Sequence, residues 1–356
     1  MKKLAREQLL SRYKKGKTIA AVDLSEIDLS GIMLTNAVFE NATLKGANLT
    51  GADLTQAVFT GCDLSGADCS GADCTYAGFI SSEMTGTCFK GATLAYARIE
   101  ESDISAGNLT QADATGLQAA SVNMKNALLV RTVASLGYWQ AVNLSGADLS
   151  GTDFSSATLS QVVLDGAVLS STIFNKTDLT GTSLKDMLFE ACDLTMADFT
   201  GADLTGAVFS GCNLFQTGFT DAVMTGARLA DLEAYAARFN GAVLKKACLE
   251  KAMLESAIFT GADLTGADFA GANMNRCMLD LAQCRAAAFT GADLSCADLS
   301  HADLTAADFS GCVLTQTNLH RVTDEMTVWD GSNKSKAKDT DADLAEAEDW
   351  QPRPKR

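Results

Sequence analysis

The sequence predicts an all-β solenoid, in which short extended segments wind around one continuous core. The first observation is a five-residue period. An apolar residue stands at every position ending in 4 or 9 from Leu24 to Leu319, which makes sixty repeats without insertion or deletion, and in 53 of them this residue is Leu, Phe, Met, Ile or Trp. The other two are an Ala two positions before 34 of these residues and a Gly two positions after 23 of them. Residues two apart point the same way in extended chain, and Gly suits the corners.

Simple secondary structure does not explain this period. A helix requires apolar residues about 3.6 apart, and a half-buried strand requires strict alternation. If the small and large residues of a repeat both face inward, the residue between them faces solvent. That residue is often Asp or Asn, as in Asp203 and Asn213. Each repeat therefore reads as a short extended piece followed by a corner.

The repeat unit also resembles a known family. Ala47-Asn48-Leu49, Ala52-Asp53-Leu54, Ala262-Asp263-Leu264 and Ala297-Asp298-Leu299 match the A(D/N)LXX motif of the pentapeptide-repeat family. The resemblance extends over residues 22–319. It implies a right-handed quadrilateral parallel β-helix with four pentapeptides per coil, hence about 15 coils.

The placement of Phe supports four repeats per coil. Fifteen of the sixteen Phe occupy the five-residue register, and seven of them share one column at a spacing of twenty residues, which begins Phe39, Phe59, Phe79. The column through Leu24, Leu44 and Leu64 has no Phe. We therefore expect residues twenty apart to stack on successive coils as aromatic ladders.

Composition narrows the class of protein. The 356 residues carry a net charge of −16 and include eleven Cys. Eight Cys are at inward positions and read as small core residues: Cys62, Cys69, Cys74, Cys192, Cys212, Cys277, Cys284 and Cys312. Thiols in a reducing cytosol are favoured over a disulfide between Cys192 and Cys212. No secretory signal or membrane span is visible, so the expected location is the cytoplasm, with signal-independent export left open.

The N-terminal residues 1–21 read as a cap. Residues 2–15 predict a short amphipathic helix with Leu4, Leu9, Leu10 and Tyr13 on one face, and Gly16 is placed to end it. A solenoid needs its open end covered, which favours capping of the first coil. The alternative is a basic docking helix for an acidic partner or a lipid.

Outward apolar residues form the candidate partner-binding surface. Over residues 105–143 the motif weakens and outward positions become apolar, which predicts an irregular stretch of the same coil or, alternatively, a kink or binding patch. Val168, Leu188 and Val208 are twenty apart and predict an apolar ladder, which strand pairing alone also favours. The candidate residues are Leu128, Val133, Leu136, Tyr138, Val168, Leu188 and Val208.

The period fails after Leu319. Residues 320–330 read as a C-terminal cap with Trp329 over the last coil. Residues 331–356 predict a disordered charged tail, because they are poor in apolar residues and hold the only two Pro, Pro352 and Pro354. A transient helix over residues 341–348 is the alternative within this tail.

The sequence offers no catalytic, cofactor-binding or metal-binding set. His301 and His320 are the only His, and neither pairs with a nucleophile in a pocket that this fold would provide. The recurring Gly mark corners and do not form a phosphate loop. We therefore expect a protein without enzymatic activity, without a cofactor and without direct nucleic-acid binding, whose partners are proteins and include a second copy in a homodimer.

Three functions remain open. The first is a scaffold or adaptor that binds proteins along the outer faces of a rigid acidic rod. The second follows from the resemblance: pentapeptide proteins that protect DNA gyrase mimic duplex DNA, although here Asp is spread over all four faces. The third is a role in bacterial type VI secretion, because Glu7-Gln8-Leu9-Leu10, Asp23-Leu24-Ser25 and Asp28-Leu29-Ser30-Gly31 are similar to segments found with its cargo proteins.

Overall fold

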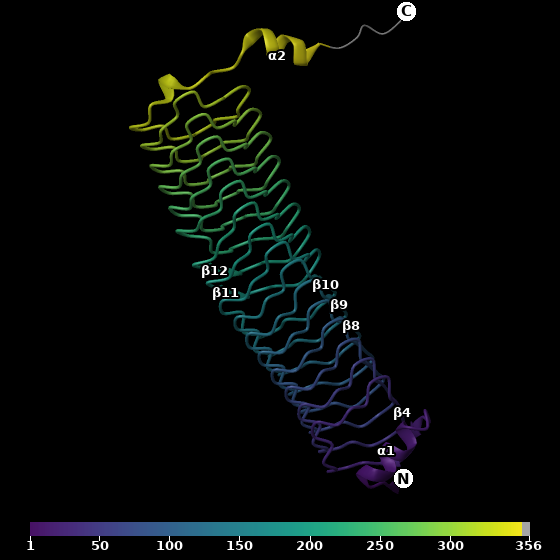
Figure 1. Cartoon of the computed structure of the whole chain (residues 1–356). Helices are drawn as coiled ribbons and strands as arrows, with labels where there is room; N and C mark the ends of the chain where they lie inside the picture. Colours follow the sequence, from purple (N-terminus) through teal and green to yellow (C-terminus); the bar gives the residue numbers. More distant parts are fainter. Residues whose placement is uncertain (351–356) are drawn as a thin grey trace, which may run out of the picture. The chain divides into compact units, whose positions relative to one another are not determined.

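The computed structural model describes residues 1–350 and divides the chain into two compact units. The first unit contains Met1–Leu184 and Leu188–Ala197, and the second contains Lys185–Met187 and the chain from Asp198 onward. Each unit is a parallel β-solenoid of very short strands with few helices (Figure 1). The all-β class predicted from the five-residue period is therefore confirmed.

The first unit contains most of the named strands. Eight of them form one parallel sheet in the order β10-β9-β8-β7-β6-β5-β4-β2. Their bounds are β2 Ile19–Ala20, β4 Val38–Glu40, β5 Val58–Thr60, β6 Gly78–Ile80, β7 Arg98–Glu100, β8 Gln118–Ala120, β9 Tyr138–Gln140 and β10 Thr158–Ser160. Two further strands, β1 (Lys2–Lys3) and β3 (Val22–Asp23), pair in parallel, and β11 (Leu188–Glu190) also belongs to this unit.

Strand pairs and isolated bridges join residues twenty apart. Phe39 pairs with Phe59, and on another face Asp28 pairs with Asn48. At the corners, the N–H of one residue donates to the carbonyl nineteen residues later, as from Gly31 to Thr50 at 2.9 Å. The residue at this corner has a positive φ, 59° at Gly31. This left-handed conformation explains the Gly that recurs two residues after each large apolar residue.

The second unit repeats the same register mostly through single-residue bridges. Its one named strand is β12 (Val208–Ser210). A typical ladder runs from Asp203 to Val223, Val243 and Asp263. Because every bridge connects parallel segments of neighbouring coils, each coil is stabilised mainly by the coils directly beside it.

The core consists of the predicted inward residues. All sixty register residues from Leu24 to Leu319 are buried, and so are the residues two positions before them, except the half-buried Ile27. Phe rings stack as expected: the ring centroids of Phe39 and Phe59 are 4.6 Å apart, and those of Phe239 and Phe259 are 4.7 Å apart. The prediction of aromatic ladders at a spacing of twenty is confirmed.

Hydroxyl and thiol groups at the small inward positions are paired within the core. The Thr87 hydroxyl donates to the Leu64 carbonyl at 2.8 Å, and Thr152 repeats this bond to Leu129 at 2.6 Å. Cys277 makes the same contact to Leu254 through its Sγ, at 3.0 Å. All eleven cysteines are thiols, and burial raises the pKa of Cys312 to about 12. The eight buried Cys are therefore core residues with unreactive thiols, whereas Cys88 and Cys248 are half-buried and Cys296 is exposed.

The outward Asp and Asn residues stabilise the corners. The Oδ1 of Asp28 accepts the backbone N–H of Ser30 at 3.0 Å, and Asp308 accepts that of Ser310 at 2.8 Å. The backbone hydrogen bond from Ser30 lowers the pKa of Asp28, and the hydroxyl and backbone N–H of Ser310 lower the pKa of Asp308. This local bond is the physical reason for Asp or Asn in the repeat.

We expect acid to destabilise the solenoid through these carboxylates. A group whose pKa is lower in the folded chain contributes stability above its ordinary pKa, and that stability is lost as the pH falls through the folded pKa. Urea midpoints are therefore expected to stay level from about pH 7 to 5 and to fall below the ordinary Asp value of 3.8. Asp28→Asn keeps the acceptor oxygen without the charge, so it is expected to reduce the pH dependence; an unchanged acid profile would contradict this assignment.

The N-terminal helix is shorter than predicted. α1 covers Arg6–Tyr13, and residues 2–3 form strand β1 instead of its first turn. Leu9 is fully buried, and the Arg6 guanidinium donates to the carbonyls of Asp28 and Ser30 at 3.1 Å each. The first coil thus offers β1 an open edge to pair with, which outweighs one more helical turn. Gly16, with a φ of 62°, ends the segment as expected.

The C-terminal segment differs most from expectation. Residues 320–330 continue the coil, because Asp303 bridges Thr323, Asp308 bridges Val328, and Trp329 stacks on Phe309 at 4.7 Å. Residues 331–350, for which the sequence predicts disorder with a transient helix over 341–348 as the alternative, contain the 3₁₀ helix η1 (Lys334–Lys336) and α2 (Ala342–Asp349). Polar contacts with the coil, treated below, order this apolar-poor segment. Residues 351–356, with Pro352 and Pro354, lie outside the described residues.

Candidate functional site

The predicted surface residues are exposed with one exception. Leu128, Val133, Leu136, Tyr138, Val168 and Leu188 all lie in the first unit with exposed side chains. Val208 lies in the second unit, where it bridges Arg228, and its side chain is half-buried. Val168 and Leu188 line a small hollow of about 120 Å³.

One group of exposed apolar side chains lies at and beside a single column of corners in the first unit. We call Tyr76, Tyr96, Leu136 and Tyr138 the apolar corner. The Tyr76 and Tyr96 rings stack at 5.3 Å, and a Cβ on Gly116 would lie 2.6 Å from the Tyr96 ring. Tyr96, Gly116 and Leu136 follow one another at a spacing of twenty, so the absence of a side chain at Gly116 makes room for the Tyr96 ring.

The weakened motif around residues 105–143 does not interrupt the solenoid. Asn108 bridges Leu128, and Leu128 in turn bridges Asp148. On the next face, Asp113 bridges Val133. The segment is therefore regular coil with unusually apolar outer positions, and those positions are what distinguishes it.

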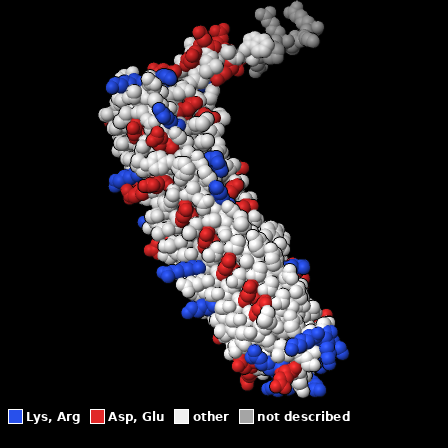
Figure 2. Space-filling view, viewed as in Figure 1, with Lys and Arg blue, Asp and Glu red and all other residues white. Residues whose placement is uncertain are grey.

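Charged side chains are dispersed over the surface, as Figure 2 shows for one face. Several form ion pairs between neighbouring coils at a spacing of eighteen residues. Lys185 pairs with Asp203 at 3.1 Å, and Lys245 pairs with Asp263 at 3.0 Å. Many surface carboxylates therefore have a structural role, either in these ion pairs or in the hydrogen bonds at the corners.

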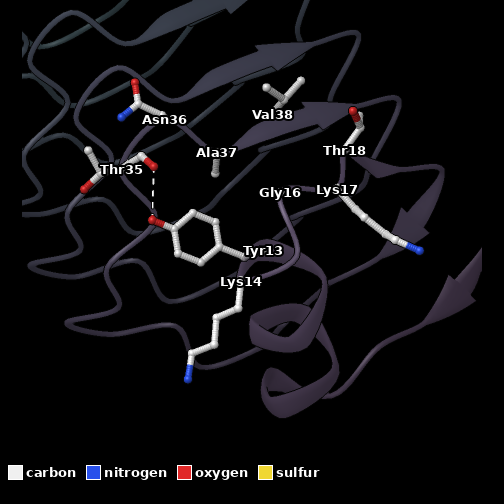
Figure 3. Close-up of a pocket in the computed structure, with 9 residues that line it drawn as sticks. All are labelled: Tyr13, Lys14, Gly16, Lys17, Thr18, Thr35, Asn36, Ala37 and Val38. Carbon is white, nitrogen blue, oxygen red and sulfur yellow. Dashed lines mark hydrogen bonds between the residues drawn. The ribbon is translucent and has the colours of Figure 1, made fainter.

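A pocket of about 440 Å³ lies between the end of α1 and the first coil (Figure 3). Tyr13, Lys14, Lys17 and Thr35 are among its lining residues, and the Tyr13 hydroxyl donates to the Thr35 carbonyl at 3.1 Å. It has amine and hydroxyl groups but no carboxylate, thiol or imidazole, so it lacks the acid–base groups of a hydrolytic centre.

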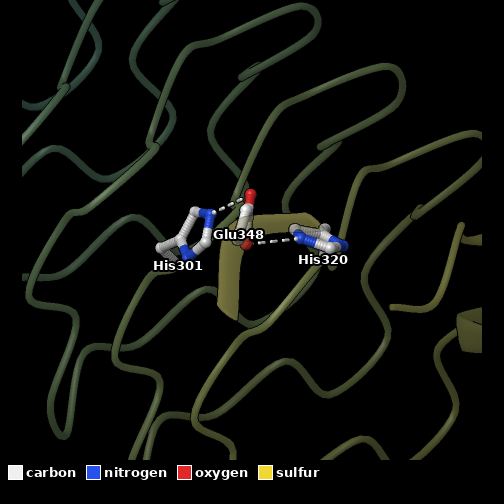
Figure 4. Close-up of side chains that lie close together, drawn as sticks. All are labelled: His301, His320 and Glu348. Carbon is white, nitrogen blue, oxygen red and sulfur yellow. Dashed lines mark hydrogen bonds and ion pairs between the residues drawn. The ribbon is translucent and has the colours of Figure 1, made fainter. Parts of the chain in front are cut away.

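The two His residues meet one carboxylate at the C-terminal end of the second unit (Figure 4). We call His301, His320 and Glu348 the His–Glu clamp. His301 Nε2 lies 3.3 Å from Glu348 Oε1, and His320 Nε2 lies 3.3 Å from Glu348 Oε2. His320 is buried, and its Nδ1 accepts the backbone N–H of Asp341 at 3.1 Å. His320 thus contacts both ends of α2, its N-cap residue Asp341 and Glu348.

The hydrogen bonds of His320 argue against a metal centre. Within residues 1–350 this is the one group of three side chains spaced to hold an ion. Because Nδ1 accepts an N–H, neutral His320 carries its proton on Nε2, the nitrogen that would have to bind the metal. A metal-binding imidazole instead donates its other N–H to an acceptor. The Arg321 guanidinium, 3.4 Å from Glu348, adds a competing positive charge.

The clamp is better explained as the anchor of α2. Arg321 also pairs with Asp349 and donates to the Ala345 carbonyl at 3.1 Å. Desolvation raises the pKa of Glu348, but the hydrogen bond from His320 and the neighbouring cations outweigh it, so the net pKa is lowered. The hydrogen bond from Arg321 lowers the pKa of Asp349. No side chain of α2 is fully buried, so polar contacts hold the helix in place.

Glu348→Gln is therefore expected to release α2 without unfolding the coils. It removes one charge that pairs with Arg321 and accepts from His320. Hydrogen exchange over residues 342–349 is expected to quicken by only about three- to tenfold, since each exposed ion pair is individually weak. Glu346→Gln, on the opposite side of the same helix, is the control. Equal exchange rates in the two variants would show that the His–Glu clamp does not hold α2 on the coil.

Sequence reasoning missed this cluster, although one signal was present. The His301 N–H donates to the His320 carbonyl at 2.8 Å, the same nineteen-residue corner bond found along the chain. The repeat register alone therefore places the two His on adjacent coils. Glu348 could not be added, because its segment does not carry the repeat.

The structure is a parallel solenoid in which nearly every five-residue unit buries two side chains, most often one large and one small. Sequence models of the family described as pentapeptide repeats match residues 23–61, 52–95, 222–261, 237–276 and 282–321, and the model of the pentapeptide repeat region matches residues 138–219. The chain belongs to the pentapeptide-repeat family. No curated protein sequence matches it.

Several solved structures are similar to this chain at low identity. A trypsin-treated variant of QnrB1, a plasmid-mediated fluoroquinolone resistance protein, is 19% identical over 54% of this chain and 89% of its own, with a TM-score of 0.44. HetL, a pentapeptide repeat protein involved in heterocyst differentiation regulation from the cyanobacterium Nostoc sp. strain PCC 7120, is 20% identical over 94% and 96%, with a TM-score of 0.18. At these TM-scores neither similarity carries an argument about function.

Within residues 1–350, none of the helices has the length and apolar composition needed to cross a bilayer.

Proposed function

We propose that this protein is a non-enzymatic cytoplasmic scaffold that binds a protein partner through the apolar corner of its first unit. The observation that carries the proposal is the clustering of exposed Tyr76, Tyr96, Leu136 and Tyr138 on a regular, fully packed coil. Tyr side chains contribute large contact area at low entropic cost, and exposed aromatic clusters mark interaction sites. Val133 on the adjoining face extends the same surface, whereas Leu128 is one face further along the coil, opposite Tyr138.

The proposal includes the finer architecture of the scaffold. We propose a right-handed, four-sided coil with about 15 turns; the sixty repeats and the bridges twenty residues apart support its four sides and its number of turns, and the family resemblance supports its hand. In such a coil the inside is filled by its own side chains, so binding takes place on the outer walls. The partner contacts are then spaced by the coil repeat of about 4.8 Å.

Site-specific photo-crosslinking tests the apolar corner. A photoreactive amino acid is placed at Leu136 or, as the control, at Leu281 in the second unit. The two corner residues are matched, with 61% and 59% exposure and φ values of 59° and 62°. We expect one protein to be captured from native extract at Leu136 and not at Leu281, and Tyr96→Lys to abolish the capture. Equal capture at both positions would contradict the proposal.

Binding of DNA gyrase by mimicry of duplex DNA is the alternative with a direct assay. Paired Lys residues and corner hydrogen bonds reduce the free negative charge along the coils, so this proposal receives less support. Supercoiling by gyrase is expected to be unaffected by saturating amounts of the protein. Protection of gyrase from a fluoroquinolone would instead favour mimicry. An adaptor role in type VI secretion is compatible with the scaffold and predicts neighbouring secretion genes.

A further inference from the structure

The two terminal helices have complementary free faces. On α1, Arg6, Leu9 and Tyr13 contact the first coil, which leaves Glu7, Leu10, Ser11 and Lys14 along a different face. On α2, Ala345, Glu348 and Asp349 face the coil, which leaves Asp343, Glu346, Ala347 and Trp350 outside. Both free faces follow the spacing i, i+3, i+4, i+7, which forms one stripe on a helix.

The charges of these faces are opposite. Residues 1–17 contain seven Lys or Arg and one Glu in a chain whose net charge is −16. Lys14 and Lys15 are exposed beside the free face of α1. The free face of α2 carries the exposed carboxylates of Asp343 and Glu346. Figure 2 shows basic side chains gathered near the N-terminal end of the first unit and acidic ones over α2.

Each face also presents an apolar side chain to solvent. Trp350, at the end of the α2 stripe, is 71% exposed, and a hollow of about 480 Å³ lies beside it. Leu10 is half-buried at the edge of a hollow of about 420 Å³ on α1. A Trp left this exposed on a helix that its own coil holds by polar contacts alone is unusual and marks a contact surface.

We propose that α1 of one molecule packs antiparallel on α2 of a second copy of this chain. The antiparallel direction places Lys14 opposite Asp343 and Leu10 opposite Ala347. The parallel direction would instead place Glu7 opposite Asp343, which brings two carboxylates together. It also brings the C-terminal end of α1 to the N-terminal end of α2, where the helix dipoles attract. The occupant of each face is thus the other end of an identical molecule.

The contact is heterologous and is therefore more specific than the homodimer expected from the sequence. Each pairing uses α1 of one chain and α2 of the other, so a bound pair still has one free face of each kind. Heterologous contacts produce rings or open chains of molecules. Growth beyond a dimer at rising protein concentration is therefore a specific consequence, and added salt is expected to weaken it.

Charge exchange between two variants tests this pairing. The first variant carries Asp343→Lys and Glu346→Lys, which makes both helix faces basic. The second carries Lys14→Glu and Lys15→Glu, which makes both acidic. In sedimentation velocity from about 1 µM to 1 mM, each variant alone is expected to associate at least about tenfold more weakly than the native chain. An equimolar mixture is expected to regain association to within about threefold, because every basic face then meets an acidic one.

The controls separate pairing from misfolding and from net charge. Asp165→Lys with Glu233→Lys makes the same change in net charge at exposed sites elsewhere, and native association is expected. Trp350→Ala keeps all charges and is expected to associate more weakly. Hydrogen exchange over residues 342–349 verifies that α2 stays docked in the first variant. A native chain that remains monomeric at the highest concentration, or a mixture no more associated than its components, overturns the proposal.

Discussion

Phe219→Ala is expected to destabilise the second unit by about 3–5 kcal/mol, the range measured for large aromatic truncations in closed cores. Phe219 is fully buried and contacts three other rings: Phe199 and Phe239 stack on it at 5.3 and 5.0 Å, and Phe209 meets it edge-on at 6.1 Å. Loss of this ring leaves a cavity that the flanking coils cannot close, because their hydrogen-bonded ladders fix the spacing between them.

The chain supplies a matched control for this truncation. Phe215 is the one Phe outside the five-residue register, and its side chain is exposed. Phe215→Ala is expected to change the free energy of unfolding by about 0.5 kcal/mol or less. Urea denaturation measures both variants, and hydrogen exchange is expected to quicken first in the coils around residues 199–239. Similar losses for the two variants would show that the ring ladder is not a main source of stability.

Gly137→Ala is expected to destabilise the first unit by about 1–3 kcal/mol through overpacking. A Cβ at this position would lie 2.4 Å from the Trp139 indole nitrogen and 3.0 Å from the Ala134 carbonyl oxygen. The backbone oxygen cannot move without breaking the coil, and the indole is fully enclosed. Thermal or urea unfolding of the variant measures the loss.

Trp139→Phe tests the same site from the other side. Within the described chain, Trp139 Nε1 is the one buried side-chain nitrogen or oxygen that has no hydrogen-bond partner. Removing an unpaired buried donor offsets the lost packing, so this variant is expected to stay within about 1 kcal/mol of the native chain. In the double variant that combines Gly137→Ala with Trp139→Phe, the smaller ring is expected to relieve the clash. Its free energy of unfolding is then expected to be at least about 0.5 kcal/mol higher than the sum of the single effects gives. Strictly additive effects would contradict the contact between Gly137 and Trp139.

The repeat made the solenoid predictable down to single side chains. Because one register specifies both burial and stacking, the sequence indicated that Phe39 lies on Phe59 and that Leu204 and Phe209 are buried, as observed. Physical redundancy explains this success: a five-residue unit repeated sixty times leaves one consistent way to bury its apolar side.

The ends of the chain were less predictable, because their contacts occur once. Asp324 interrupts the apolar register and reads as the end of the coil, yet the backbone bridges continue past it to Val328. The docking of α2 depends on Arg321 and on the pairing of Glu348 with two His. No periodic pattern in the sequence predicts these polar contacts. Of the apolar corner, the sequence indicated Leu136 and Tyr138 as outward apolar residues, but it did not connect Tyr76 and Tyr96 with them.

The twenty-residue bridge spacing has a consequence for how this protein can change in length. Removing twenty residues, such as 205–224, would excise one full circuit and return every later side chain to the wall it occupied before. Removing five would keep the interior well filled but shift each later wall by a quarter of a circuit. Related proteins could thus lengthen in steps of twenty residues and keep their outward side chains aligned along each face. A step of five residues would move all later outward side chains to the neighbouring face.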